Sequence, residues 1–184
     1  MNIFVLHPNA EIAAIMHCDK HVPKMCVEAA QMMASALRRH GVTEKRFKVM
    51  GVVTKAGTPY KGGYAHHPCT VWAGETQSNF TWLSVHARTL CKEYRKRFGK
   101  MHACEFPIMV MSEMAKHIPV GKRTPFAQAM PDEYRVEYRH PENITNCYND
   151  AVQAYRAYYH SKQFAKWEKG TPAPDWWRGV EVTA

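Results

Sequence analysis

The segment HCDKHVPK at residues 17–24 brings two imidazoles, a thiol, a carboxylate and two amines into eight positions. Its second half continues at spacings of three and four residues, so one side of a helix would carry a line of polar groups. An amine and a carboxylate one helical turn apart can serve as a nucleophile and a general base. The plain alternative is a solvated face with an exposed ion pair. The line consists of His21, Lys24, Glu28, Gln31 and Ser35.

A second polar stripe runs along a helix expected over residues 75–98. One side of this helix is apolar and another is small, polar and basic, so the stripe between them is expected to be half buried. Carboxylate and amide groups in such a place could form the wall of a cleft that faces Lys24 and Glu28. The alternative is a hydrogen-bonded helix interface without chemistry. The stripe consists of Glu75, Asn79, Trp82, His86 and Glu93.

Histidine and cysteine side chains near these stripes are candidates for metal ligands or nucleophiles. The sequence HCDKH lacks the glutamate of an HExxH zinc motif, and the neighbouring lysines disfavour a cation. We therefore expect no metal ion and no cofactor. Cys18, beside Lys20 and His21, is expected to be a packed thiol rather than a nucleophile. The candidate ligands are His17, Cys18, His21, His66, His67 and Cys69.

Basic residues outnumber acidic ones, with 25 Lys and Arg against 16 Asp and Glu and a formal net charge of +9. Such a balance favours an anionic partner, and interleaved tyrosines and tryptophans provide stacking surfaces for nucleic acid. The alternative is ordinary solubilising charge. We predict a DNA partner, double-stranded with an extruded base. The residues predicted to bind it are Lys20, Gln31, Arg38, His66, His67, Trp72, Arg95, Lys96, Arg97, Lys122 and Arg123.

The length of 184 residues suits one ordinary domain with a real core. No apolar run approaches the roughly 20 residues needed to cross a bilayer, and the start MNIFVLHPN does not resemble a secretory signal. Six cysteines without CxxC spacing indicate buried or free thiols in a reducing compartment. We expect a cytoplasmic protein without a membrane partner.

Proline, glycine and capping residues predict an all-α, compact single-domain helical bundle over residues 1–184. The first expected elements are a buried strand or tucked terminus at 3–6, a small helix after Pro8 and Asn9, and a second helix capped by Asp19 or Val22 and closed by Gly41. The remaining ones are an irregular or hairpin-like segment at 42–66, a helical turn from His67 and Pro68, a long helix over 75–98, helical pieces around 107–117, 124–130 and 144–167, and an extended aromatic tail over 171–182 anchored by Trp176 and Trp177.

Four stretches carry a specific resemblance to a known family. They are IFVLHPNAEIAAIMHCDKHVPKMCVEAAQMM, HHPCTVWAGETQSNFTWLSVHARTLCKEYRKRFGK, TPFAQAMPDEYRV and AYRAYYHSKQFAKW. Through them the chain resembles a family of small, mostly phage-encoded proteins, which in turn distantly resemble the pyrimidine-dimer DNA glycosylase known as phage endonuclease V. The resemblance implies a compact all-helical enzyme that kinks duplex DNA and acts on a pyrimidine, in the host cytoplasm if the protein is phage-encoded.

The resemblance also implies a mechanism, from which this sequence departs. In the glycosylase, the amine of a terminal threonine attacks the sugar carbon to form a Schiff base, assisted by a glutamate and arginines of the catalytic helix. Here residue 2 is Asn2, before which Met1 is expected to be retained. His21 aligns with the glutamate, and Lys20 and Lys24 take the place of the arginines.

Either Met1 or Lys24 could supply the amine instead, if burial favours its neutral form. Glu28 would then be the general base, or would stabilise an oxocarbenium-like sugar. The first hypothesis is therefore N-glycosylase chemistry, with or without AP-lyase activity, on a damaged or modified pyrimidine in DNA. The predicted catalytic residues are His21, Lys24, Glu28, Glu75 and Asn79.

Two alternatives remain open. A phage enzyme could hypermodify thymine or cytosine in DNA and displace phosphate or pyrophosphate, for which a row of Lys20, His21 and Lys24 would be suitable. If the protein is such a transferase, the mass of the base should change when a small donor is supplied. A non-catalytic DNA-binding or host-interaction protein could keep the same fold.

Overall fold

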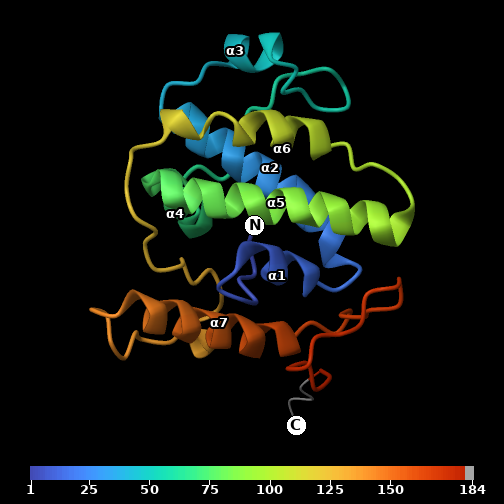
Figure 1. Ribbon diagram of the computed structural model, residues 1–184, viewed down its shortest axis with the longest axis vertical. Helices are drawn as coiled ribbons and strands as arrows, with labels where there is room; N and C mark the ends of the chain where they lie inside the picture. The colour runs from blue at the N-terminus through green and yellow to red at the C-terminus, as the bar shows by residue number, and fades with distance from the viewer. Residues whose placement is uncertain (181–184) are drawn as a thin grey trace.

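Helices account for all regular secondary structure in the computed structural model, which describes residues 1–180. Val53 and Pro59 form an isolated antiparallel bridge, and the described residues contain no strand. The predicted all-α fold is confirmed (Figure 1). None of these helices is both long and apolar enough to span a membrane. The α-helices are α1 (Ala10–Ile15), α2 (His21–Arg39), α3 (Glu44–Val49), α4 (Pro68–Glu75), α5 (Gln77–Phe98), α6 (Glu105–Ser112) and α7 (Ile144–His160), and the 3₁₀-helices are η1 (Ala115–His117) and η2 (Asp132–Tyr134).

Side-chain caps explain where several helices begin. The Asn9 carboxamide accepts hydrogen bonds from two backbone N–H groups in the first turn of α1. The Thr76 hydroxyl accepts one from Asn79 N, and the extended backbone of Thr76 separates α4 from α5. The helix expected over 75–98 is therefore α5 alone, with α4 as the helical turn before it. Gly99, with φ of 68°, ends α5 in the left-handed conformation that glycine adopts readily.

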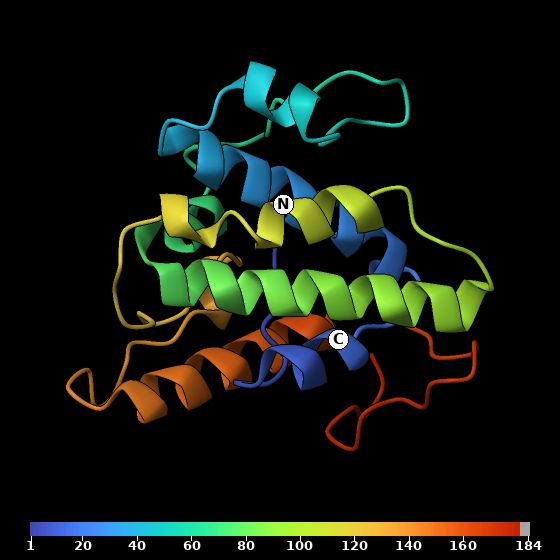
Figure 2. The same ribbon diagram turned by 45° about the horizontal axis from the view of Figure 1, so that its top comes forward.

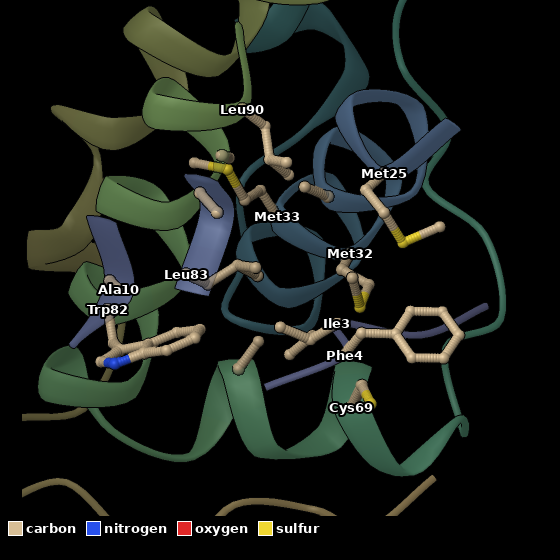
Figure 3. Packing of buried hydrophobic residues seen from close by; sticks show 14 of the residues in the cluster. Ile3, Phe4, Ala10, Met25, Met32, Met33, Cys69, Trp82, Leu83 and Leu90 are labelled. Carbon is tan, nitrogen blue, oxygen red and sulfur yellow. The ribbon is translucent and has the colours of Figure 1, made fainter. Parts of the chain in front are cut away.

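The central layer consists of α2 and α5, which pack against each other. α4 and α6 contact both of these helices, and α1 packs on α5 (Figures 1 and 2). The facing side chains are apolar, with Met33 of α2 near Leu83 and Leu90 of α5 (Figure 3). Burying one such side chain stabilises the fold by about 1.5–3 kcal/mol. The apolar side of α2 is thus used for the core, which leaves its other side free for polar groups.

The first nine residues run without regular structure between this layer and α7. On one side, the Leu6 carbonyl accepts a hydrogen bond from Arg156 Nε of α7 at 3.0 Å. On the other side, Phe4 lies close to Cys69 of α4 (Figure 3). The apolar start of the chain is therefore a tucked terminus and not a strand. This path places Met1 beside Lys24 and Glu28 of α2 and on the same pocket as Tyr158 of α7.

The predicted irregular segment at 42–66 contains one short helix. α3 is capped by the hydroxyl of Thr43 and anchored by the fully buried Phe47. The remainder is irregular, as predicted, apart from the isolated bridge. The start of α2 also differs from the prediction, because the helix begins at His21 without a side-chain cap.

The segment at 124–130, which was predicted to be helical, has no regular structure. Thr124 N donates a hydrogen bond to Asn79 Oδ1 at 2.9 Å, and Ala127 O accepts one from Tyr155 OH at 2.6 Å. Side chains of α5 and α7 therefore bond the backbone of this segment along its irregular path.

α7 ends at His160, earlier than the predicted end near residue 167. The aromatic tail beyond it packs on the core through Trp176 and Trp177, as predicted. The ring of Trp177 stacks on His160 with a centroid distance of 4.8 Å. Residues 181 and 182 of the predicted tail lie outside the described residues.

Candidate active site

Two pockets meet at the first residue of the chain. The first, which we call the His21 pocket, has a volume of about 200 Å³. The second, the Tyr64 pocket, has a volume of about 370 Å³. Met1, Lys24 and Glu28 line both pockets and form the place where they join. The His21 pocket is completed by Asn2, Phe4, His21, Tyr158, Lys162 and Phe164, and the Tyr64 pocket by Val27, Gln31 and Tyr64.

Glu28 lies at the centre of the polar groups in this region. Its Oε2 accepts a hydrogen bond from Asn2 N at 2.6 Å and lies 3.9 Å from the α-amino nitrogen of Met1. Its Oε1 lies 3.7 Å from Nζ of Lys24, one turn earlier on α2. One largely buried carboxylate therefore contacts two primary amines, and it is placed to accept a proton from either.

A tight turn at Asn2 brings the amino terminus to Glu28. Asn2 Oδ1 accepts hydrogen bonds from Ile3 N at 2.8 Å and Phe4 N at 2.9 Å, and Asn2 Nδ2 donates one to Ala129 O. Phe4 has a left-handed φ of 50°, which costs a non-glycine residue of order 1 kcal/mol or more. Asn2 therefore acts as an anchor at the position where the resemblance implies a threonine nucleophile.

His21 is a neutral part of the pocket wall. It is buried, its Nδ1 lies 2.7 Å from the hydroxyl of Tyr159, and its ring stacks on Phe4 with centroids 4.6 Å apart. Burial, with a smaller contribution from nearby positive groups such as Lys24, lowers the pKa of His21 to about 2. At neutral pH the imidazole is therefore uncharged, and it shapes the pocket by packing.

The opposite wall comes from α7 and the residues that follow it. Nζ of Lys162 lies 3.4 Å from the ring centroid of Tyr158, and Nζ of Lys20 lies 4.8 Å from that of Phe164. Cations beside aromatic faces suit a ligand with phosphates and bases. The sequence did not single out Tyr158, Lys162 or Phe164, because no local pattern indicates that this distant segment folds back onto α2.

Comparison with known families identifies the protein family to which the chain belongs. Residues 1–105 match the family model described as pyrimidine dimer DNA glycosylase. The chain belongs to this family. No curated protein and no solved structure matches the chain. The implied relationship to pyrimidine dimer DNA glycosylases is thus confirmed and makes DNA the substrate class, whereas a phage origin stays a prediction.

Glu75 and Asn79, which were predicted to be catalytic in this pyrimidine dimer DNA glycosylase family member, line neither pocket. Asn79 is fully buried, and its Nδ2 donates hydrogen bonds to Trp72 O and Thr124 Oγ1, both at 2.8 Å. Asn79 Oδ1 accepts a hydrogen bond from Thr124 N. The hydroxyl of Thr124 in turn donates one to Glu75 Oε2 at 2.9 Å. The predicted cleft between the two stripes is therefore not formed. These residues instead join α4, α5 and the loop at Thr124.

The residues predicted to bind DNA fall into three groups in this glycosylase-family protein. Gln31 lines the Tyr64 pocket, and Lys20 lies beside Phe164 of the His21 pocket. The side chains of Trp72 and Arg97 are buried and bonded within the protein, so nothing in their surroundings supports the predicted contact with DNA. The other residues are at least partly exposed but line neither pocket, and their contact with DNA stays a prediction: Arg38, His66, His67, Arg95, Lys96, Lys122 and Arg123.

The histidine and cysteine candidates are mostly buried residues of the core. Within residues 1–180, no three or more His, Cys, Asp and Glu side chains are grouped so as to hold a metal ion. All six cysteines are free and buried, Cys18 among them, as predicted. Burial lowers the pKa of His17 to about 4 and that of His86 to about 3, so both are neutral in the folded protein at pH 7.

Proposed function

We propose that this protein removes a damaged or modified pyrimidine base from DNA, with a primary amine as the nucleophile. The observation that carries the proposal is the contact of Glu28 with both the Met1 α-amine and Lys24 Nζ, at the junction of two pockets. Membership in the pyrimidine dimer DNA glycosylase family supports DNA as the substrate. The cations and aromatic rings of α7 and of the residues that follow it support the same substrate class, since they suit phosphates and bases.

In the proposed reaction, Glu28 first takes a proton from the ammonium group and leaves a neutral amine. The amine nitrogen attacks C1′ of the target nucleotide, while the bond from C1′ to the pyrimidine nitrogen breaks. The electron pair of that bond leaves with the base, which takes up a proton. The attached nitrogen then loses a proton, the bond from C1′ to O4′ breaks, and O4′ keeps its electron pair and takes up a proton, which leaves a protonated Schiff base. The Glu28 carboxylate also stabilises positive charge that develops on the sugar.

We infer that Met1 supplies this amine. Its side chain is 1% exposed, with Sδ 3.5 Å from Thr70 Oγ1, whereas the Lys24 side chain is 64% exposed. A nitrogen that is already held in place loses less freedom when it attacks. In addition, α-amino groups in general are weaker bases than lysine side chains, so more of them are neutral at pH 7. Lys24 is then left to contact a phosphate.

Borohydride trapping tests this proposal. The protein is incubated with duplexes that contain an abasic site or a damaged thymine, and the reductant converts a Schiff base into a stable covalent adduct. We expect an adduct, and peptide mass mapping should place it on Met1. An adduct on Lys24 would transfer the role of nucleophile to that side chain. If no duplex gave an adduct or strand cleavage, the amine mechanism would be rejected.

Two modifications separate the candidate amines. Lys24→Arg keeps the positive charge but removes the lysine amine, and we expect the adduct to persist. Transamination of the terminal residue converts its α-amine into a carbonyl and leaves lysines intact, and we expect it to abolish the adduct. The opposite pair of results would assign the nucleophile to Lys24.

The transferase alternative fits the structure less well. It relies on a cationic row of Lys20, His21 and Lys24, but burial holds the pKa of His21 at about 2. The row therefore contributes two charges at neutral pH rather than three. A mass increase of thymine or cytosine in DNA, after addition of a small phosphorylated donor, would favour this alternative over base removal.

A further inference from the structure

Tyr64 combines an exposed ring with a backbone conformation that residues other than glycine rarely adopt. Its φ is 53° and it is 69% exposed. Between residues 1 and 180, Phe4 is the only other non-glycine residue with a positive φ, and it lines the neighbouring His21 pocket. Strained positions of this kind concentrate at binding and catalytic sites. Both of them flank Met1, which suggests that each aromatic ring is held for a ligand.

Helix α2 fixes the backbone on both sides of Tyr64. Ser35 Oγ donates a hydrogen bond to Gly63 O at 3.0 Å and accepts one from Gly63 N at 2.8 Å. Arg39 donates to the carbonyl of the residue after Tyr64. A Cβ atom at Gly62 would overlap Ser35, so only glycine permits this close approach. The ring is therefore exposed on a fixed support, and a ligand that stacks on it would not have to order the loop.

The chemistry of the Tyr64 pocket suits a nucleobase. The flat face of Tyr64 and the exposed apolar side chain of Val27 offer contact area, and the carboxamide of Gln31 offers a hydrogen-bond donor and an acceptor. Lys24 lies between this pocket and the His21 pocket, where it can contact a phosphate that joins two nucleotides. Aromatic stacking accepts any base, because every base has a π-face.

We propose that the Tyr64 pocket is a second nucleobase site, in which the Tyr64 ring stacks on the base next to the target nucleotide and Gln31 faces the edge of that base. This inference rests on the proposed function, because it takes the nucleotide in the His21 pocket as the target. The shared wall of Met1, Lys24 and Glu28 places the two bases on either side of the reacting amine.

Binding measurements with matched variants test the second site. Tyr64→Ala removes the ring, Tyr64→Phe keeps it, and Phe106→Ala removes a half-exposed ring of α6 that lines neither pocket. On a duplex with an abasic site, we expect Tyr64→Ala to weaken binding about 10-fold. Tyr64→Phe and Phe106→Ala should bind like the unmodified protein. Equal affinities for Tyr64→Ala and the unmodified protein would overturn the proposal.

A fluorescent base locates the stacking directly. With 2-aminopurine placed on one side or the other of the abasic site, binding should quench the fluorescence on one side, and Tyr64→Ala should remove that quenching. If Tyr64→Ala does not fold, Gln31→Ala leaves the loop intact and should weaken binding about threefold. Quenching that is identical in the unmodified protein and Tyr64→Ala, or unchanged affinity of Gln31→Ala in that case, would overturn the proposal.

Covalent trapping separates failure of this inference from failure of the proposed function. If no duplex gives an adduct but Tyr64→Ala still weakens binding and Tyr64→Phe restores it, the base site stands and the amine mechanism fails. If an adduct forms and Tyr64→Ala changes neither affinity nor quenching, the amine mechanism stands and the base site fails.

Discussion

The polar stripe on α2 and the polar stripe at the junction of α4 and α5 contain similar side chains. They differ in how many of the polar atoms already have hydrogen-bond partners within the protein, that is, in how far they are saturated. Each polar atom of the Asn79 side chain has a partner within the protein, and the residue is fully buried. Glu28, by contrast, contacts two amines at 3.7 and 3.9 Å beside two open pockets. Chemistry requires unused bonding capacity that faces a space for substrate, and only the α2 stripe provides it.

Residue type alone does not distinguish the two stripes. A carboxylate and an amide one turn apart occur in both stripes as candidates for catalysis. In the second stripe, the backbone N–H of Thr124 occupies the acceptor that a substrate would have used. A variant at each stripe should therefore affect a different property, chemistry in one case and stability in the other.

The largest expected effect is that of Glu28→Gln on adduct formation. The variant keeps an acceptor for Asn2 N but loses the charge that takes up the amine proton. We expect the single-turnover rate of borohydride trapping to fall about 10²- to 10³-fold. Glu44→Gln, which disrupts a surface ion pair with Arg38, is the matched control and should leave the rate unchanged. If Glu28→Gln is trapped at the normal rate, the α2 stripe does not support the chemistry and does not differ from the other stripe in this respect.

Asn79→Ala should reduce stability and leave the chemistry intact. It leaves Thr124 N without its acceptor and Trp72 O without its donor, so we expect a loss of about 2–3 kcal/mol in the free energy of unfolding, measured with urea. Gln77→Ala, in the same turn of α5 but without a side-chain hydrogen bond among the described residues, is the control and should change stability little. A large fall in trapping rate at unchanged stability would instead indicate that Asn79 takes part in the reaction.

Mild acid should destabilise the protein through its buried histidines. The pKa values of His17, His86 and His21 are lowered in the folded state to about 4, 3 and 2, so these groups take up protons between pH 7 and 6 only when unfolded. Stability is therefore complete above the unfolded pKa of about 6.5 and falls as the pH drops below it. From pH 7 to 6 we expect a loss of about 0.7 kcal/mol per histidine, or about 2 kcal/mol for the three.

Urea unfolding at the two pH values checks this expectation, and NMR titration of His21 sharpens it. If His21 is still neutral at pH 5, it is a structural residue like Asn79, although it lines the pocket. A His21 that becomes protonated near pH 6 would instead make it a cation available to substrate.

The smallest expected effect is that of Lys162→Ala on DNA affinity. Loss of one phosphate contact should weaken binding about three- to fivefold at moderate salt and lower the slope of log K against log salt by about one. Lys116→Ala removes an exposed lysine of η1 that lines neither pocket, and it is the matched control. Equal effects of the two variants would indicate that general charge, rather than the pocket wall, holds the DNA.

Local signals were sufficient to predict most of the helices and one wall of the site. Asn9, His67 and Gly99 mark helix ends through their own side chains or backbone freedom. The positions of Lys24 and Glu28 on one face of α2 follow from helical spacing alone. Such signals act within a few residues, so they work wherever structure is decided locally.

The other wall could not be predicted from local sequence, because distant residues supply it. Tyr158 and Lys162 approach α2 through long-range contacts, such as the stacking of Tyr158 on Phe4 and the contact of the Tyr159 hydroxyl with His21. The loop at 124–130 was misassigned for the same reason, since its hydrogen-bond partners lie on α5 and α7. Spacing also gave no sign that Asn79 is saturated, because its partner Thr124 is 45 residues away.

The path of the first residues between two layers also orders the events of synthesis. Helix α2 and its carboxylate can fold before Tyr158, Lys162 and Phe164, which lie far downstream in the sequence, have been made. Closing the contact between Phe4 and Tyr158 joins residues that are far apart in the sequence, which costs chain entropy. A nascent chain would thus hold its amine and carboxylate without a finished pocket, and the ability to act on DNA would follow only when the α7 segment has been added.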